Sequence, residues 1–274
     1  MSKIIFSDLD ATLLRDDKTI STQDMESIHR AILEGHKFVV ATGRSFESAL
    51  AVTKSLKLDL PGCYIASYNG GQIYDCMSRK VISNRTLPMS VLRELFERAN
   101  AAGVYCQTYV DGKVTSYRMT EELEYYCLHA ALEAQADEHF LDKMTQEANK
   151  ALLIHLTDHE KLQRFWDENA DWAEGKIDFI FSSRIYLEAM PHGVSKATAV
   201  EDLTKLLGMD IADTIAMGDE QNDISMIRAA GIGVAMKNGI DAAKDVADYV
   251  TEHTNNESPM TEILERFLWR EGNT

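Results

Sequence analysis

Residues 4–12 read IIFSDLDAT, so an apolar run leads directly into the carboxylates Asp8 and Asp10. The run predicts a buried β-strand. Side chains two positions apart leave a strand on the same side, so both carboxylates would emerge together at its end. Like charges this close raise each other's pKa unless a cation or hydrogen bonds compensate. We therefore expect a cationic partner there, although the pair taken alone is also typical of a solvated turn.

Three later fragments place polar groups in comparable positions. They are FVVATGR (residues 38–44), GVSK (193–196) and TIAMGDEQND (214–223). In the first and the third an apolar strand runs into polar residues, and the second opens a predicted helix. Open α/β sheets bind ligands beyond the carboxyl ends of their strands. The fragments therefore predict one site that is assembled from distant parts of the chain.

The order of elements predicts an α/β fold with a Rossmann-like parallel-sheet core. Apolar strands over 4–7, 38–41 and 64–66 alternate with helical segments. Alternation of this kind implies parallel pairing of the strands with right-handed crossovers.

The middle of the chain has a different texture and predicts an inserted domain. It holds longer helical segments and short strands, at 90–102, 121–134, 158–170, 151–156 and 185–189. The parallel-sheet pattern resumes at Lys196. We therefore expect residues 1–83 and 189–274 to form one discontinuous core and residues 84–188 to form a separate α/β cap domain.

The charge of the chain restricts its partners. The 274 residues carry 44 acidic and 28 Lys or Arg side chains, a formal net charge of −16. Nucleic acids and anionic membranes require basic patches, so neither is expected as a partner. A small phosphorylated metabolite is compatible, because a cation and one lysine reverse the charge locally. No apolar run approaches the ~20 residues that span a bilayer, which favours a cytoplasmic protein. The chain is expected to be a monomer or a small homo-oligomer.

The fragments together resemble the haloacid dehalogenase superfamily of phosphohydrolases, and within it the Cof-type phosphatases of small metabolites. The ordered set is DLDAT (8–12), ATGR (41–44), SYNG (67–70), GVSK (193–196), GDEQND (218–223) and GVAM (233–236). Each motif is weak alone, but the whole set in this order is specific. The resemblance spans essentially the whole chain and implies that the inserted domain is a cap that carries most of the substrate discrimination.

The resemblance also implies roles for the acidic residues. Asp8 would be the nucleophile that forms an aspartyl-phosphate, and Asp10 the general acid and base. The expected cofactor is Mg²⁺, because an all-oxygen ligand set suits this ion. The metal site is assigned to Asp8, Asp10 through its backbone carbonyl, and Asp219, with Asn222 and Asp223 in or next to the ligand set.

Phosphate binding would fall to residues on neighbouring loops. Thr42 and Lys196 complete the catalytic set, since a hydroxyl and an ammonium suit phosphate oxygens. Further phosphate or substrate contacts are assigned to Leu9, Gly43, Arg44, Asn69 and Asn222. For Arg44 and Asn69 a purely structural hydrogen-bonding role is an equal alternative.

Ala11 departs from the family pattern, which has glycine after the second aspartate. A backbone in the helical region tolerates the added methyl group, whereas a positive φ does not. In the second case we expect slower turnover rather than its loss.

The residues thus predict a Mg²⁺-dependent phosphatase acting on sugar phosphates or phosphorylated cofactors. One alternative is a mutase that moves phosphate within a sugar. Another is a catalytically quiet, sugar-phosphate-binding regulatory protein. The intact pair of Asp8 and Asp10 argues against the quiet protein, because a pure binder would not need both carboxylates.

Overall fold

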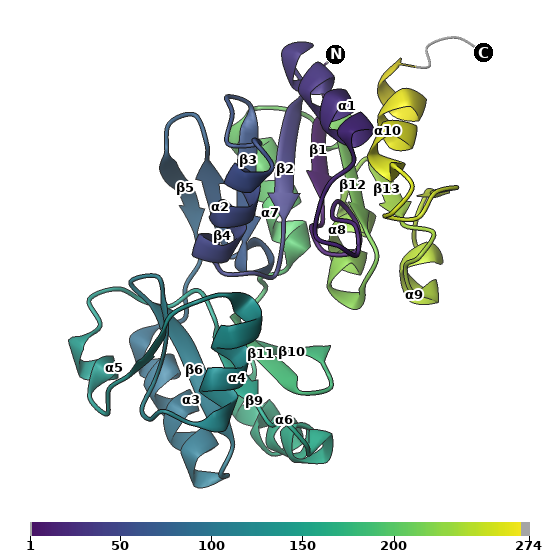
Figure 1. Ribbon diagram of the computed structural model, residues 1–274. Coiled ribbons are helices and arrows are strands. Elements are labelled where there is room, and N and C mark those ends of the chain that lie inside the picture. The colour runs from purple at the N-terminus through teal and green to yellow at the C-terminus, as the bar shows by residue number, and fades with distance from the viewer. Residues whose placement is uncertain (1, 270–274) are drawn as a thin grey trace. The chain divides into compact units, whose positions relative to one another are not determined.

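The computed structural model describes residues 2–269 and contains two separate β-sheets (Figure 1). The chain divides into two compact units, each described here by itself. The first comprises the residues up to Arg44, Ala49–Ser83 and the residues from Ser195 onward, and the second comprises Ser45–Ser48 and Asn84–Val194. Assignment of the second unit as a cap domain stays a prediction.

The first unit is built on an eight-stranded sheet of order β14-β13-β12-β1-β2-β3-β4-β5. The strands are β1 (Ile4–Ser7), β2 (Lys37–Ala41), β3 (Cys63–Ser67), β4 (Gln72–Asp75), β5 (Lys80–Asn84), β12 (Thr214–Gly218), β13 (Ile232–Ala235) and β14 (Tyr249–Val250). Pairing is parallel from β14 to β3, and β4 is antiparallel to β3. The predicted α/β fold with a parallel-sheet core is confirmed. The β4–β5 extension was not predicted, because its strands are short and β5 is largely exposed.

Helices cover both faces of this sheet (Figure 1). They are α1 (Thr22–Leu33), α2 (Phe46–Ser55), α7 (Lys196–Leu206), α8 (Ile224–Ala229), α9 (Asp241–Lys244) and α10 (Pro259–Leu264). Ile5 of β1 shares one core with Ile28 of α1 and Ile263 of α10. Phe6, the next residue along β1, shares the other core with Val200 of α7. The alternation follows from the two-residue period of a strand and makes β1 buried on both sides.

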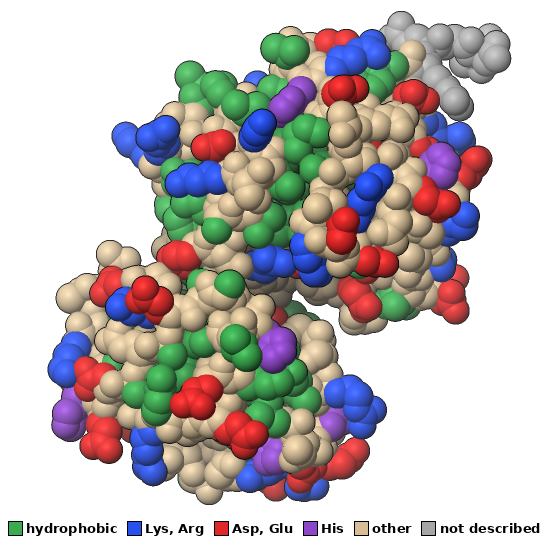
Figure 2. Space-filling view, in the orientation of Figure 1, with side chains coloured by type: hydrophobic (Ala, Val, Ile, Leu, Met, Phe, Trp, Pro, Cys, Tyr) green, Lys and Arg blue, Asp and Glu red, His purple; other side chains and the backbone are tan. Residues whose placement is uncertain are grey.

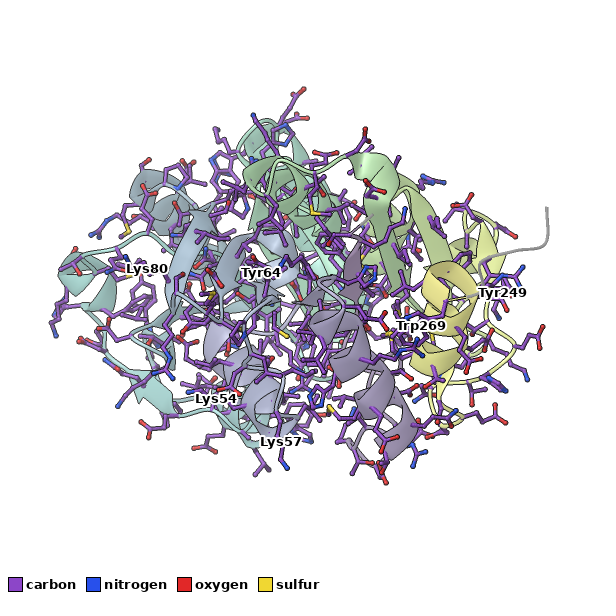
Figure 3. All side chains as sticks on the ribbon, turned by 90° about the horizontal axis from the view of Figure 1, so that it is seen from above. Lys54, Lys57, Tyr64, Lys80, Tyr249 and Trp269 are labelled. Carbon is purple, nitrogen blue, oxygen red and sulfur yellow. The ribbon has the colours of Figure 1, made fainter. Side chains whose placement is uncertain are left out.

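The last described segment is tied to α1. The carboxylate of Asp24 accepts hydrogen bonds from the backbone N–H (2.7 Å) and the hydroxyl (3.0 Å) of Thr261, at the start of α10. Trp269 donates its indole N–H to Glu34 at 2.6 Å, and the guanidinium of Arg30 lies 4.0 Å from the Trp269 ring centroid. Figure 3 shows Trp269 beside α1. These contacts anchor α10 and with it the loop that precedes it.

The second unit contains a six-stranded sheet of order β10-β11-β9-β6-β7-β8. The elements are α3 (Met89–Ala101), β6 (Tyr105–Val110), β7 (Lys113–Ser116), α4 (Glu121–Ala130), β8 (Ala134–Ala136), α5 (Phe140–Lys143), β9 (Ala151–Ile154), α6 (His159–Ala173), β10 (Ile177–Ser183) and β11 (Tyr186–Pro191). Leu95 of α3 and Phe165 of α6 pack with Leu153 of β9 in one core. α4 ends before the predicted residue 134, because Ala131 takes the left-handed conformation with φ 52°. Strands β6, β7, β8 and β10 were not predicted.

Acidic and basic side chains are interspersed over both units on the face that Figure 2 shows. No helix within residues 2–269 has the length and apolarity needed to cross a membrane. The four cysteines, Cys63, Cys76, Cys106 and Cys127, are all buried and none forms a disulfide.

Candidate active site

Parallel pairing brings the polar strand ends of the first unit to one edge of the sheet. Ser7, at the end of β1, lies in register with Val40 of β2 and Met217 of β12. The N–H of Asp8 continues the ladder to the carbonyl of Met217 at 3.0 Å. Residues that are about two hundred positions apart in the sequence therefore follow neighbouring strand ends.

Lys196 is the cation that the sequence predicted at the end of β1. Its Nζ lies 2.5 Å from Oδ1 of Asp8 and 2.5 Å from Oδ1 of Asp223, and the residue is 1% exposed. Burial disfavours the ammonium, but Asp223 and Asp8 raise the pKa of Lys196 above its ordinary value. Lys196 is the first residue of α7, and a capping box between Ser195 and Thr198 holds the first turn of this helix. Lys196 is therefore charged at neutral pH and fixed in place.

Three carboxylates meet beside this ammonium. Asp8, Asp219 and Asp223 are buried, and each offers an oxygen within 4.8 Å of the others. Burial raises the pKa of Asp8 to about 8, with Lys196 opposing, and that of Asp219 to about 6. A hydrogen bond from the Thr12 hydroxyl to Asp219 (2.7 Å) opposes the second shift. One ammonium does not balance three buried acids, so the all-oxygen set fits a divalent cation such as Mg²⁺.

Asp10 lies outside this group and faces two other cations. Its Oδ2 accepts from Nε of Arg44 at 2.8 Å, and its Oδ1 accepts from Nη2 of Arg44 at 2.7 Å and from Nζ of Lys18 at 3.0 Å. Burial opposes ionisation, but hydrogen bonds and the charges of Arg44 and Lys18 lower the pKa of Asp10. Arg44, assigned to substrate, thus has a structural partner here. Lys18 was not predicted, because a lysine in a polar turn carries no sequence signal.

The remaining predicted residues meet around Asn69. Asn69 is buried at φ 52° and ψ 38°, and its N–H donates to the carbonyl of Thr42 at 3.0 Å. Its Oδ1 accepts from Nδ2 of Asn222 at 3.0 Å, which directs the amide of Asn222 to Asn69. A Cβ on Gly43 would lie 3.0 Å from the same Oδ1. The Thr42 hydroxyl accepts the N–H of Arg44 at 3.2 Å. The group is therefore a hydrogen-bonded frame for the loop after β2.

The loop after β1 contains Ala11 in the left-handed region, with φ 58°. The Leu9 side chain is fully buried in the core, and the N–H of Leu14 donates to the Leu9 carbonyl at 2.8 Å. A left-handed alanine costs roughly 1–2 kcal/mol because its Cβ approaches the following carbonyl oxygen. The conformation is thus the one that disfavours alanine and suits the family's glycine.

Ala11→Gly should raise the free energy of unfolding by about 1 kcal/mol, because glycine adopts positive φ without this clash. Urea unfolding followed by circular dichroism measures the change. Ala51→Gly, at an exposed position inside α2, is the matched control and should destabilise by about 1 kcal/mol. A decrease in both variants would contradict the strain at Ala11.

Gly70→Ala should destabilise the first unit by more than about 2 kcal/mol. A Cβ on Gly70, which has φ 89°, would lie 2.4 Å from the carbonyl oxygen of Ser195, directly before Lys196. Gly208, with φ 64°, has no atom within 4 Å of its added Cβ, so Gly208→Ala reports the backbone strain alone. Equal losses in the two variants would mean that the close approach to Ser195 contributes nothing.

Comparisons with known proteins place this geometry in a family. The family model for haloacid dehalogenase-like hydrolases matches residues 5–263. The phosphatase YitU of Bacillus subtilis, named for 5-amino-6-(5-phospho-D-ribitylamino)uracil, is 28% identical over 97% of both chains. The crystal structure of a haloacid dehalogenase-like hydrolase from Bacteroides thetaiotaomicron has a TM-score of 0.88 and 31% identity, covering 97% of this chain and 99% of that one.

A second solved structure, TM0651 from Thermotoga maritima, is similar with a TM-score of 0.86 and 29% identity, over 97% of this chain and 98% of that one. The family model covers nearly the whole chain, including every motif on which the resemblance was based. The chain therefore belongs to the haloacid dehalogenase-like hydrolases.

Proposed function

We propose that this hydrolase is a Mg²⁺-dependent phosphatase that cleaves small phosphorylated metabolites through an aspartyl-phosphate. The observation that carries the proposal is the buried ammonium of Lys196 between Asp8 and Asp223, with Asp219 alongside. A lysine next to clustered carboxylates matches what a phosphoryl group requires: positive charge around its oxygens and an anionic nucleophile.

The residues divide the reaction into two steps. In the first, a carboxylate oxygen of Asp8 attacks phosphorus, the ester bond breaks, and the leaving alkoxide takes a proton from Asp10. In the second, Asp10 removes a proton from water, which attacks the aspartyl-phosphate, releases inorganic phosphate and restores Asp8. Lys196 stabilises negative charge on the phosphoryl oxygens throughout. Mg²⁺ held by Asp8, Asp219 and Asp223 would neutralise further charge on these oxygens.

The ionised state of Asp10 suits the second step. Arg44 and Lys18 lower its pKa, so the carboxylate is available as a base at neutral pH. For the first step Asp10 must instead be protonated, so one of its oxygens gives up a cationic partner, takes up a proton from solvent and faces the leaving group. We propose that this exchange accompanies substrate binding.

The substrates we propose are sugar phosphates or phosphorylated cofactors. The relative YitU is named for a phosphorylated ribityl compound, which supports a small polyhydroxylated ester as the substrate class. We also propose that Asn84–Val194 acts as the cap domain that selects the ester, since the assigned catalytic residues all lie outside it.

Asp8→Asn should abolish turnover of p-nitrophenyl phosphate while leaving the circular dichroism spectrum unchanged, because it removes the nucleophile but keeps its shape. Phosphate release in the presence of Mg²⁺ measures the activity and also separates a phosphatase from a mutase, which conserves ester phosphate. Asp171→Asn, at an exposed position of α6, is the control and should keep full activity. More than a few per cent residual activity in Asp8→Asn, a loss of less than about 30-fold, would rule out the aspartyl-phosphate.

Mg²⁺ should raise Tm more at pH 8 than at pH 5.5. The pKa values of about 8 for Asp8 and about 6 for Asp219 mean that both carboxyls hold protons at the lower pH, which the ion must displace. Thermal unfolding without Mg²⁺ and with about 5 mM Mg²⁺ measures the shift in Tm. Asp219→Asn should reduce the shift at pH 8. An equal shift at both pH values would contradict binding at these carboxylates.

A further inference from the structure

The left-handed backbone of Ala11 is strained, so contacts from other residues are needed to keep it in this conformation. An alanine in this conformation tends to relax toward negative φ, and Ala11 directly follows Asp10. Such relaxation would rotate the peptide between the two residues and move the Asp10 side chain. Something must therefore hold the turn.

Two asparagine amides hold its backbone carbonyls. Nδ2 of Asn238 donates to the carbonyl of Ala11 at 2.8 Å. Nδ2 of Asn255, which is 4% exposed, donates to the carbonyl of Leu14 at 3.0 Å. Asn238 follows β13 and Asn255 follows β14, so both amides come from loops beyond neighbouring strand ends. The two amides therefore bind the turn at both of its ends, at Ala11 and at Leu14.

The amide of Asn238 has its orientation set by the second asparagine. The backbone N–H of Asn255 donates to Oδ1 of Asn238 at 3.0 Å. Because an amide oxygen only accepts and an amide nitrogen only donates, this bond directs Nδ2 of Asn238 to the Ala11 carbonyl. The two side chains therefore act as one unit.

The loop that supplies Asn255 is itself anchored. The carboxylate of Glu262 in α10 accepts the backbone N–H groups of Glu252 (2.8 Å) and His253 (3.0 Å). It also accepts the Tyr249 hydroxyl at 2.6 Å, and Figure 3 shows Tyr249 beside this helix. The loop that carries Asn255 is thus anchored to the packed helix α10.

We propose that Asn238 and Asn255 are positioning residues that keep Ala11 left-handed and thereby hold Asp10 in place for catalysis. Neither residue touches the carboxylate cluster. Both amides bind backbone carbonyls of the turn, and Asn255 also donates to Oδ1 of Asp16 at 3.0 Å, so the two residues compensate for an alanine at a position that suits glycine. The effect on turnover rests on the proposed phosphatase function, whereas the effect on the turn does not.

Asn238→Ala tests the inference with p-nitrophenyl phosphate as the substrate. Loss of one hydrogen bond to the turn should lower kcat about fivefold, with KM changed less than about twofold. Adding Ala11→Gly should restore most of kcat, because glycine adopts the turn without the asparagine. Asn256→Ala is the comparison: Asn256 bonds to Asp16 and, at 3.5 Å, to Oδ1 of Asn255 but not to Ala11, so kcat should fall much less than in Asn238→Ala.

Hydrogen exchange of the peptide covering residues 9–15 gives a readout that is independent of activity. The Leu14 N–H, which bonds to the Leu9 carbonyl, should exchange faster in Asn238→Ala and slow again when Ala11→Gly is added. Unchanged exchange in Asn238→Ala would overturn the inference. So would a loss of kcat that Ala11→Gly does not rescue. A wild-type protein inactive on every phosphate ester would instead overturn the proposed function, and exchange would still decide the role of the asparagines.

Discussion

The structure of the site depends on one buried ion cluster, in which the ammonium of Lys196 lies between Asp8 and Asp223. Breaking a buried pair by removing one partner costs about 3–5 kcal/mol, because the remaining charge is left uncompensated. The cluster joins the end of β1, the start of α7 and the turn after β12. These three segments therefore have little freedom to move independently.

The packing around Lys196 also restricts the movement of these segments. Gly70 lets its own turn approach the Ser195 carbonyl, and the Ser195–Thr198 capping box fixes the first turn of α7. Asp223 also holds the loop after β12, because its Oδ2 accepts hydrogen bonds from the backbone N–H groups of Asp219 and Glu220 at 2.9 Å each. A carboxylate that pairs with the lysine also shapes the loop that carries Asp219. Charge balance and loop geometry are thus secured by the same groups.

Three residues with a strained backbone lie at this edge of the sheet. Ala11, Tyr68 and Asn69 all have φ between 52° and 58°, and all lie in loops that follow strand ends. Non-glycine residues at positive φ persist only where their surroundings hold them. Here the surroundings are specific: Asn69 is bound to Thr42 and Asn222, and Ala11 is bound to Asn238. The strain is carried by hydrogen bonds from neighbouring loops.

The sequence by itself determined the α/β class, the parallel strands β1, β2, β3 and β12, and the family. Where strands and helices alternate along a chain, an apolar run of about four or five residues that ends in polar groups predicts a buried parallel strand. The order of the motifs is specific to the family. Only the tertiary structure decided that Arg44 and Lys18 bind Asp10, that Asn222 bonds to Asn69, and that Asn238 and Asn255 hold the turn at Ala11. The physical reason is that a polar side chain on a loop has many reachable partners, and which one it meets depends on how distant strand ends come into register.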